Sequence, residues 1–279
     1  MALTKPLSNF LINPSFLKNL RKKKNLKIID CRWYLEDPNR GRIEFEKTHI
    51  DNAIFFDVEK LCDHTSDLPH MLPKIKHFTE YVRKHYLNIK DEIIIYDQVG
   101  FFSSARAWFC FKYFGYVNVK ILNGGYQAWI RQKNYNKNNI SKKDTSRFSN
   151  KIKADPELVI NKINIQINLK KKKCQIIDAR PIKRFQGLVS EPRPFLNRGN
   201  IDSSINIPFV DIVKKNGYLK SLINLKKLIL KKKLKKENLI ICYCGSGITA
   251  CNIFFVLSIL GFKKIKLYDG SWAEWGKKI

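Results

Sequence analysis

The chain has 279 residues, a length that predicts two domains. Of these residues, 44% are hydrophobic and 12% are aromatic, a composition that excludes a chain disordered over its whole length. No run approaches the roughly 18 uninterrupted apolar residues of a membrane-spanning helix, so none is predicted. The 53 Lys and Arg against 24 Asp and Glu give a net charge of +29, which fits either a nucleic-acid or anionic-membrane partner, or a lysine-rich composition on solvated faces. We favour the second interpretation, because only 12 of the basic residues are arginine.

Short runs of β-branched residues alternate with stretches of helical periodicity along the chain. The predicted strands cover residues 28–31, 53–56, 93–97 and 119–122, and then 175–178, 205–207, 239–243 and 264–268. Such alternation predicts an α/β fold in which a mainly parallel sheet is flanked by helices on both faces. The polar, non-periodic residues 134–152 predict a linker between an N-terminal domain, 1–133, and a C-terminal domain, 153–279.

The two halves repeat the same landmarks in the same order. The string Ile-Ile-Asp-Cys-Arg that ends at Arg32 recurs as Ile-Ile-Asp-Ala-Arg ending at Arg180. The Asn-Gly-Gly that begins at Asn123 recurs as the Asp-Gly-Ser that begins at Asp269. The separation between matching landmarks is nearly constant, which predicts two copies of one domain. Because ligands of such sheets bind at the carboxyl ends of the strands, the chemistry is expected there.

A cysteine directly follows the predicted strand that ends at Tyr243. It begins a glycine-rich loop, Cys-Gly-Ser-Gly-Ile-Thr-Ala over residues 244–250, which leads into a predicted helix. Glycines permit a tight loop whose N–H groups turn toward one anion, and the helix N-terminus adds positive potential. Such a position favours the thiolate over the thiol. The pattern therefore predicts that Cys244 is a nucleophile rather than a buried structural cysteine.

This loop resembles the active-site loop of the rhodanese superfamily, and it differs only at Ile248 from the Cys-Gly-Ser-Gly-Val-Thr-Ala signature of the 3-mercaptopyruvate sulfurtransferases. The resemblance covers nearly the whole chain in tandem two-domain form, with family-like strings at 32–35, 70–73, 191–193, 206–209 and 268–272. It implies a sulfurtransferase that moves sulfur from 3-mercaptopyruvate through a persulfide on Cys244 to a thiol or cyanide acceptor, releasing pyruvate. The acceptor it implies is a thioredoxin-like protein or a small thiol.

The residues after Cys244 separate this chemistry from related loops. A cysteine phosphatase needs an arginine where Ala250 stands, and a P-loop needs Gly-Lys-Ser or Gly-Lys-Thr, which is absent. Thiosulfate-using rhodaneses carry basic residues directly after the cysteine, whereas this chain has Gly245 and Ser246. The neutral pair favours a donor whose charge lies on a carboxylate. The alternatives are a thiosulfate sulfurtransferase, a relay for RNA thiolation, and a non-catalytic rhodanese-like module that docks nucleic acid through its lysines.

The resemblance also implies how the donor and the persulfide are held. Arg184 and Arg193 match the family's pair that binds the carboxylate and carbonyl of mercaptopyruvate, in keeping with the preference of carboxylates for arginine. Main-chain N–H groups of the loop are implied to hold the persulfide anion as an oxyanion hole holds oxygen. The loop residues assigned to this cradle are Gly245, Gly247, Ile248 and Thr249.

A histidine and an acidic residue complete the implied catalytic set. By resemblance His70 assists the cysteine together with Ser246. The family's third member is an aspartate, and the aligned position here is Glu59, one methylene longer; Asp63 is the alternative. No cysteine or histidine cluster has metal-ligand spacing, so neither a metal nor an organic cofactor is predicted.

The equivalent loop of the first copy begins with Asp97 in place of a cysteine. A carboxylate cannot attack a sulfur donor, so the N-terminal domain is predicted to be catalytically silent.

The seven cysteines follow no regular spacing, which predicts free thiols in a reducing compartment. The N-terminus has no continuous apolar stretch and no small-residue cleavage site, so no secretory signal is predicted. Together these features predict a cytoplasmic protein.

Overall fold

The computed structural model describes residues 7–20, 23, 25–132, 148, 151–171 and 174–278. The chain divides into two compact units. The first comprises Met1–Asp63, Leu72–Asp155 and Lys215–Leu219, and the second comprises His64–Met71, Pro156–Lys214 and Lys220–Ile279. His70 therefore belongs to the second unit. Most of the predicted linker, 134–152, lies outside the described residues.

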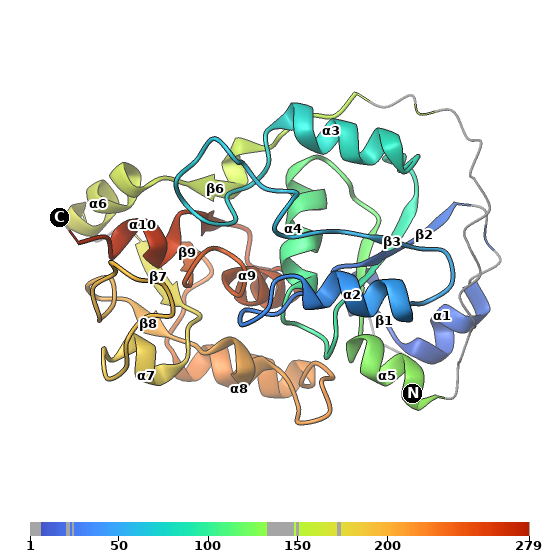
Figure 1. The fold of residues 1–279 in the computed structure, drawn as a ribbon. Coiled ribbons are helices and arrows are strands. Elements are labelled where there is room, and N and C mark those ends of the chain that lie inside the picture. The colour runs from blue at the N-terminus through green and yellow to red at the C-terminus, as the bar shows by residue number, and fades with distance from the viewer. Residues whose placement is uncertain are drawn as a thin grey trace. The chain divides into compact units, whose positions relative to one another are not determined.

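The first unit contains a sheet of parallel strands in the order β1-β5-β4-β2-β3, of which β1, β2 and β3 are labelled in Figure 1. The strands are β1 (Leu11–Ile12), β2 (Leu26–Asp30), β3 (Ala53–Phe55), β4 (Glu92–Tyr96) and β5 (Val119–Leu122). The helices are α1 (Pro14–Leu20), α2 (Arg40–Lys47), α3 (Ile75–Lys84), α4 (Ser104–Tyr113) and α5 (Gly125–Arg131).

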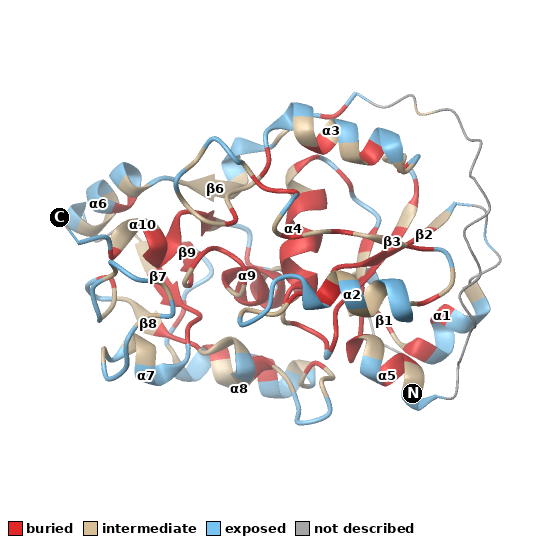
Figure 2. Cartoon of the chain, viewed as in Figure 1, coloured by how far each residue is buried: buried red, intermediate tan, exposed pale blue. Residues whose placement is uncertain are grey.

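Helices cover both faces of this sheet because its central strand is apolar on both sides. On one face, Ile94 and Tyr96 of β4 pack in a core with Leu17 of α1 and Trp129 of α5. On the other face, α4 packs against β4, and the Phe78 ring of α3 contacts the Phe111 ring of α4 edge-on. The helix α4 is buried over most of its length (Figure 2).

The second unit repeats this arrangement with the strand order β6-β10-β9-β7-β8. Its strands are β6 (Val159–Ile160), β7 (Cys174–Asp178), β8 (Ile205–Asn206), β9 (Leu239–Tyr243) and β10 (Ile265–Tyr268). Its helices are α6 (Lys162–Lys171), α7 (Ile182–Phe185), α8 (Leu222–Lys231), α9 (Ala250–Ile259) and α10 (Ser271–Trp275). The register repeats as well, because Asp30 is aligned with Tyr96 and Asp178 with Tyr243.

The predicted fold class, two tandem α/β domains with mainly parallel sheets, is confirmed. All eight predicted strands are present, whereas the edge strands β1 and β6 were not predicted. Each is defined by its pairing with β5 or β10, a strand that lies far away in the sequence. Within the described ranges, no helix combines the length and the apolar character that crossing a membrane requires.

Each unit buries an aspartate–arginine pair where its second strand ends. Asp30 at the end of β2 receives Arg32 Nε at 3.0 Å, and Asp178 at the end of β7 receives Arg180 Nε at the same distance. All four side chains are almost fully buried. Because a buried charge is tolerated only when it is paired and hydrogen-bonded, these pairs fix the chain as it leaves the strand.

The environment of His85, just after α3, leads us to expect a measurable pH dependence of the unfolding free energy. Burial, with a contribution from Lys84, lowers the pKa of His85 from 6.5 to about 4, and its ring packs on Tyr81. Between these two pH values the unfolded chain binds more protons than the folded chain, so stability is lost as the pH falls through this window. We expect His85→Asn to reduce the slope of unfolding free energy against pH there, measured by urea titration. The exposed His64 is the matched control, and an unchanged slope in the His85 variant would refute the assignment.

Candidate functional site

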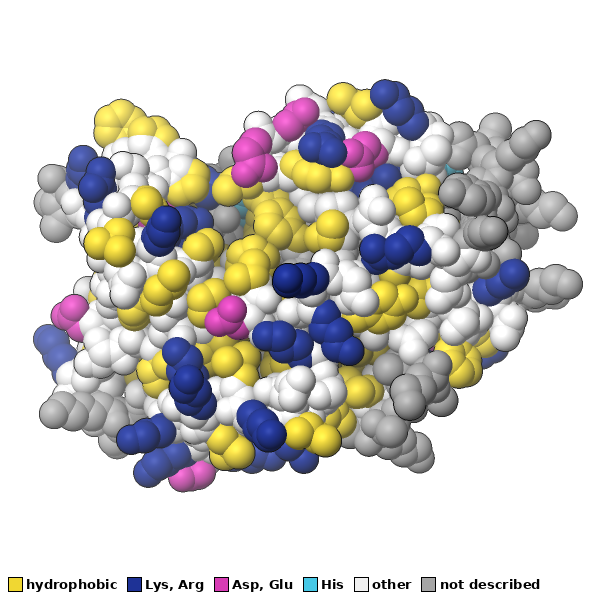
Figure 3. Space-filling view, turned by 90° about the horizontal axis from the view of Figure 1, so that it is seen from below, with side chains coloured by type: hydrophobic (Ala, Val, Ile, Leu, Met, Phe, Trp, Pro, Cys, Tyr) yellow, Lys and Arg dark blue, Asp and Glu magenta, His cyan; other side chains and the backbone are white. Residues whose placement is uncertain are grey.

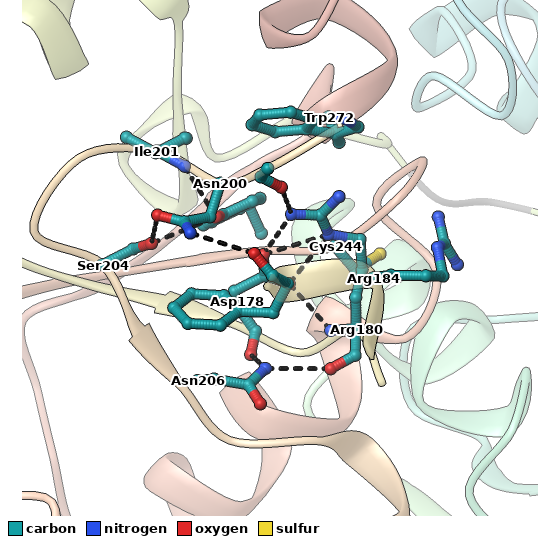
Figure 4. A network of polar contacts seen from close by, with 12 residues as sticks. Asp178, Arg180, Arg184, Asn200, Ile201, Ser204, Asn206, Cys244 and Trp272 are labelled. Carbon is teal, nitrogen blue, oxygen red and sulfur yellow. Dashed lines mark hydrogen bonds and ion pairs between the residues drawn. The ribbon is translucent and has the colours of Figure 1, made fainter. Parts of the chain in front are cut away.

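Cys244 lies at the carboxyl end of β9, and its backbone is held by the start of α10. The Trp272 N–H donates to the Cys244 carbonyl at 2.9 Å, and the Ala273 N–H donates to the Gly245 carbonyl at 2.9 Å. The Cys244 N–H donates to Ser271 Oγ at 3.1 Å. The side chain of Cys244 is only slightly exposed, and its sulfur is drawn in Figure 4. These three bonds fix the direction in which the chain leaves the strand.

The loop after Cys244 leads directly into α9, which is buried over nearly its whole length (Figure 2). Gly247 has a φ of 77°, a left-handed conformation that suits glycine. The N-cap residue Thr249 makes no side-chain capping bond. In the part of the chain that the structure describes, no N–H group of residues 246–249 donates to a protein acceptor. These amides, at the positive end of a helix, form a site that favours an anion.

The equivalent loop of the first unit is closed on a carboxylate. Asp97 Oδ2 accepts N–H groups from Phe102 at 2.7 Å, Ser103 at 3.0 Å and Ser104 at 2.9 Å. Its Oδ1 accepts from two further amides, those of residues 99 and 100. The N–H of Tyr126 in α5 anchors the Asp97 carbonyl at 2.8 Å, as α10 anchors Cys244. In the first unit, the N–H groups of the loop therefore surround the carboxylate of Asp97, the residue that begins the loop.

The other cysteines differ from Cys244 in position. All seven are free, and none of the others begins a loop at a helix N-terminus. Burial raises the pKa of the thiols of Cys31 and Cys242, and it raises the pKa of Cys62 to about 11. Burial also raises the pKa of Cys174. These four remain protonated at neutral pH and are poor nucleophiles.

His70, Ser246 and Arg193 come together in the second unit. His70 Nδ1 lies 3.0 Å from Ser246 Oγ and 3.5 Å from Arg193 Nη2, and the imidazole is 5% exposed. A guanidinium only donates, so Nδ1 is the unprotonated nitrogen when Arg193 donates to it. His70 has a φ of 59°, which turns the chain sharply where its side chain meets the loop of Cys244. The histidine and the serine are thus brought together as predicted, although their roles stay predictions.

Arg184 lies against the residue that follows Cys244. A Cβ built on Gly245 would lie 2.9 Å from Arg184 Nη2. The guanidinium therefore lies against the open side of Gly245, and it would have to shift for a larger residue at this position. Figure 4 shows Arg184 with Cys244 and the pair formed by Arg180 and Asp178. Of the two predicted substrate arginines, Arg184 thus lies against a loop residue, and Arg193 lies against His70, which in turn contacts Ser246.

The two candidates for the third catalytic member lie in the first unit. Glu59 Oε1 accepts a hydrogen bond from Trp33 Nε1 at 2.6 Å. Asp63 Oδ1 lies 3.9 Å from Lys74 Nζ. The hypothesis that one of them orients His70 stays a prediction.

Glu191 is a site residue that the sequence analysis did not assign. Its side chain is nearly fully buried and contacts both Arg180 and Arg184. The only available signal was its place in the Glu-Pro-Arg string, which does not reveal what the carboxylate contacts. No group of three or more His, Cys, Asp or Glu side chains within the described segments is arranged to hold a metal ion.

The chain is similar to known proteins over most of its length. The rhodanese-like domain model matches residues 13–132 and 165–278. The chain is 36% identical over 262 residues to the 3-mercaptopyruvate sulfurtransferase of Mus musculus, covering 93% of this chain and 88% of that protein. It is 37% identical over 256 residues to the protein of the same name from Escherichia coli strain K12, covering 91% and 90%.

A thiosulfate sulfurtransferase of Mus musculus is 32% identical over 259 residues, covering 91% of this chain and 86% of that protein. The crystal structure of SseA from Escherichia coli, described as a 3-mercaptopyruvate sulfotransferase with the rhodanese fold, superposes with a TM-score of 0.85 at 32% identity, covering 95% of this chain and all of that one. With both units matched and the loop of Cys244 at the end of β9, the chain belongs to the rhodanese family, in its tandem-domain group of sulfurtransferases.

Proposed function

We propose that this protein transfers sulfur from 3-mercaptopyruvate, through a persulfide on Cys244, to a thiol or cyanide acceptor, and that it releases pyruvate. The observation that carries the proposal is the loop of Cys244, whose amides face no protein acceptor within the described residues, whereas the same loop in the first unit is closed on the Asp97 carboxylate. A loop that surrounds a carboxylate in one copy is suited to surround a charged sulfur in the other. The named relatives support this choice of reaction.

In the first step the Cys244 thiolate attacks the sulfur of the donor. The new S–S bond forms as the C–S bond of mercaptopyruvate breaks, and the electron pair of that bond passes to the carbon as the enolate of pyruvate. The proton of the donor thiol is the one that the enolate carbon needs. Ser246 and His70, 3.0 Å apart, are placed to pass it, so that the products are pyruvate and the persulfide anion.

The donor is held through its carboxylate and carbonyl by Arg184 and Arg193. Arginine suits this role because its planar set of donors matches a carboxylate. The persulfide anion then rests on the amides of the loop, from Gly245 through Gly247 and Ile248 to Thr249.

In the second step the acceptor attacks the outer sulfur, and the Cys244 thiolate leaves. With cyanide the product is thiocyanate, and with a thiol, such as that of a thioredoxin-like protein, it is the acceptor's persulfide. Each half-reaction balances without a metal or an organic cofactor. The first unit takes no sulfur, because Asp97 stands where the nucleophile would be. The seven free thiols agree with a reducing compartment, and we place the protein in the cytoplasm.

The contact between Arg184 and Gly245 favours mercaptopyruvate over thiosulfate as the donor. A basic side chain after the cysteine, as in thiosulfate-using rhodaneses, would meet the Arg184 guanidinium. The alternative of a nucleic-acid-binding module finds no support on the face drawn in Figure 3, where the Lys and Arg side chains lie singly or in small groups among hydrophobic and uncharged surface.

Mass spectrometry of the intact protein and of its Cys244 peptide tests the proposal. After incubation with 3-mercaptopyruvate and no acceptor, we expect one additional sulfur atom on Cys244, which cyanide then removes as thiocyanate. Thiosulfate at the same concentration serves as the comparison donor. An unmodified Cys244 after mercaptopyruvate treatment would refute the proposal, and faster loading by thiosulfate would reassign the donor.

A further inference from the structure

We propose that Glu191 determines the donor specificity of this site, by positioning Arg184 and by setting the charge of the arginine cluster. The proposal rests on the proposed function, because it assumes that Arg184 binds the carboxylate of the donor. Glu191 contacts no reacting atom in this scheme and acts through the arginine.

The carboxylate of Glu191 joins two arginines of different kinds. Its Oε1 accepts from Arg180 Nη1 at 2.8 Å, and its Oε2 accepts from Arg184 Nε at 3.1 Å and also from Arg184 Nη2. Arg180 is already committed to the protein, because it pairs with Asp178, donates to the Gly199 carbonyl at 2.8 Å and is fully buried. Glu191 therefore ties the partly exposed Arg184 to the fully buried Arg180.

This contact decides which part of Arg184 remains for a ligand. Glu191 occupies the edge of the guanidinium formed by Nε and Nη2, and Nη1 donates to no protein acceptor within the described part of the chain. With Nη2 against the position of Gly245, the guanidinium is held beside the residue that follows the nucleophile. A substrate carboxylate that binds Nη1 then meets a hydrogen-bonding N–H group whose position is set before binding. This lowers the entropic cost of holding the substrate.

Glu191 also lowers the positive charge of the cluster. The two arginines of the network, 180 and 184, are balanced by the two carboxylates of Asp178 and Glu191, so that loss of the Glu191 charge would leave one additional positive charge beside the loop of Cys244. That additional charge would favour thiosulfate, which carries two negative charges, relative to mercaptopyruvate, which carries one carboxylate. Because the carboxylate of Glu191 is 1% exposed, water screens this effect little.

The first unit contains the same arrangement without a nucleophile. Glu44 receives Arg40 Nε at 2.8 Å, and its Oε2 lies 3.6 Å from Nη1 of Arg32, the equivalent of Arg180. There the outer arginine is 55% exposed and the glutamate 30%, against 17% and 1% in the second unit. The glutamate that joins two arginines is therefore buried and close to both of them in the unit that carries Cys244. In the unit that carries Asp97, it is more exposed and farther from the inner arginine.

Steady-state kinetics of Glu191→Gln with the two donors test the proposal, and Glu44→Gln is the matched control. For Glu191→Gln we expect KM for 3-mercaptopyruvate to rise about tenfold with kcat within about twofold, since uniform binding is lost rather than transition-state stabilisation. We also expect the ratio of kcat/KM for thiosulfate to that for mercaptopyruvate to rise at least about tenfold. Glu44→Gln should leave both quantities unchanged. An unchanged ratio in Glu191→Gln would overturn the proposal.

Dependence on Arg184 is tested in a double-mutant cycle. In an Arg184→Ala background, Glu191→Gln should raise KM no further, and an undiminished second effect would show that Glu191 does not act through the arginine. Should Glu191→Gln fail to fold, Glu191→Asp keeps the charge but is too short to join both arginines. That variant should raise KM for mercaptopyruvate without improving thiosulfate, and an unchanged KM would overturn the proposal.

The two proposals fail in different ways. If the wild-type protein forms no persulfide from mercaptopyruvate, or if Arg184→Ala leaves KM unchanged, the proposed function or its carboxylate site is wrong. If the persulfide forms and Arg184→Ala raises KM, whereas Glu191→Gln changes neither KM nor donor preference, only the role of Glu191 is wrong.

Discussion

Replacing Cys244 by serine is expected to reduce sulfur transfer from 3-mercaptopyruvate by at least about a thousandfold, the scale on which loss of a covalent nucleophile acts. A serine hydroxyl at this position is not ionised at neutral pH, and it cannot form the S–S bond that carries the sulfur. The fold should not change, because the bonds that anchor residue 244 run through its backbone to α10. Pyruvate release under saturating donor and thiol acceptor is the measurement, with circular dichroism to verify the fold.

Cys174→Ser is the control for this experiment. Cys174 begins β7 in the same unit, it is a free thiol, and its raised pKa keeps it protonated at neutral pH. We expect this variant to retain wild-type turnover. Turnover near the wild-type rate in Cys244→Ser would mean that another group attacks the donor.

Removing the carboxylate of Asp178 should destabilise the second unit by about 3–5 kcal/mol, the usual cost of leaving one member of a buried ion pair alone. Asp178 is fully buried at the end of β7, and its oxygens receive both the Nε and the backbone N–H of Arg180. In Asp178→Ala the guanidinium keeps Glu191 and the Gly199 carbonyl but loses its principal partner. Hydrogen exchange of the β9 amides, which reports the unfolding free energy of this unit, is the measurement.

Asp202→Ala serves as the comparison for Asp178→Ala. Asp202 is exposed in the same unit, so its removal should change stability by less than about 0.5 kcal/mol. A loss below about 1 kcal/mol in Asp178→Ala would contradict the assignment of this pair as a structural anchor.

The repeated strands of this protein were predictable because they are local features. Strands of a parallel sheet covered on both faces are continuous apolar runs, and β4 and β9 consist almost wholly of such residues. The edge strands β1 and β6 were missed for the opposite reason. Each is two residues long and is defined by its pairing with β5 or β10, which lies far away in the sequence.

The loop of Cys244 was also predictable, since its glycines and the start of α9 follow one another in the chain. The sequence by itself determined the nucleophile candidate, the duplication and the fold class. The assignment of Arg184 and Arg193 to substrate binding came only through the resemblance and stays a prediction.

Tertiary structure alone decided which side chains meet around the loop. The segment His64–Met71 belongs to the second unit, and His70 there lies within hydrogen-bonding distance of Ser246. The carboxylate of Glu191 reaches two arginines, and the pattern of residues around it gives no sign of this. Periodicity and motif spacing report the local backbone, whereas hydrogen bonds between side chains depend on how segments distant in the sequence pack. A loop of consecutive residues can therefore be predicted from the sequence, whereas the network of charged side chains around it cannot.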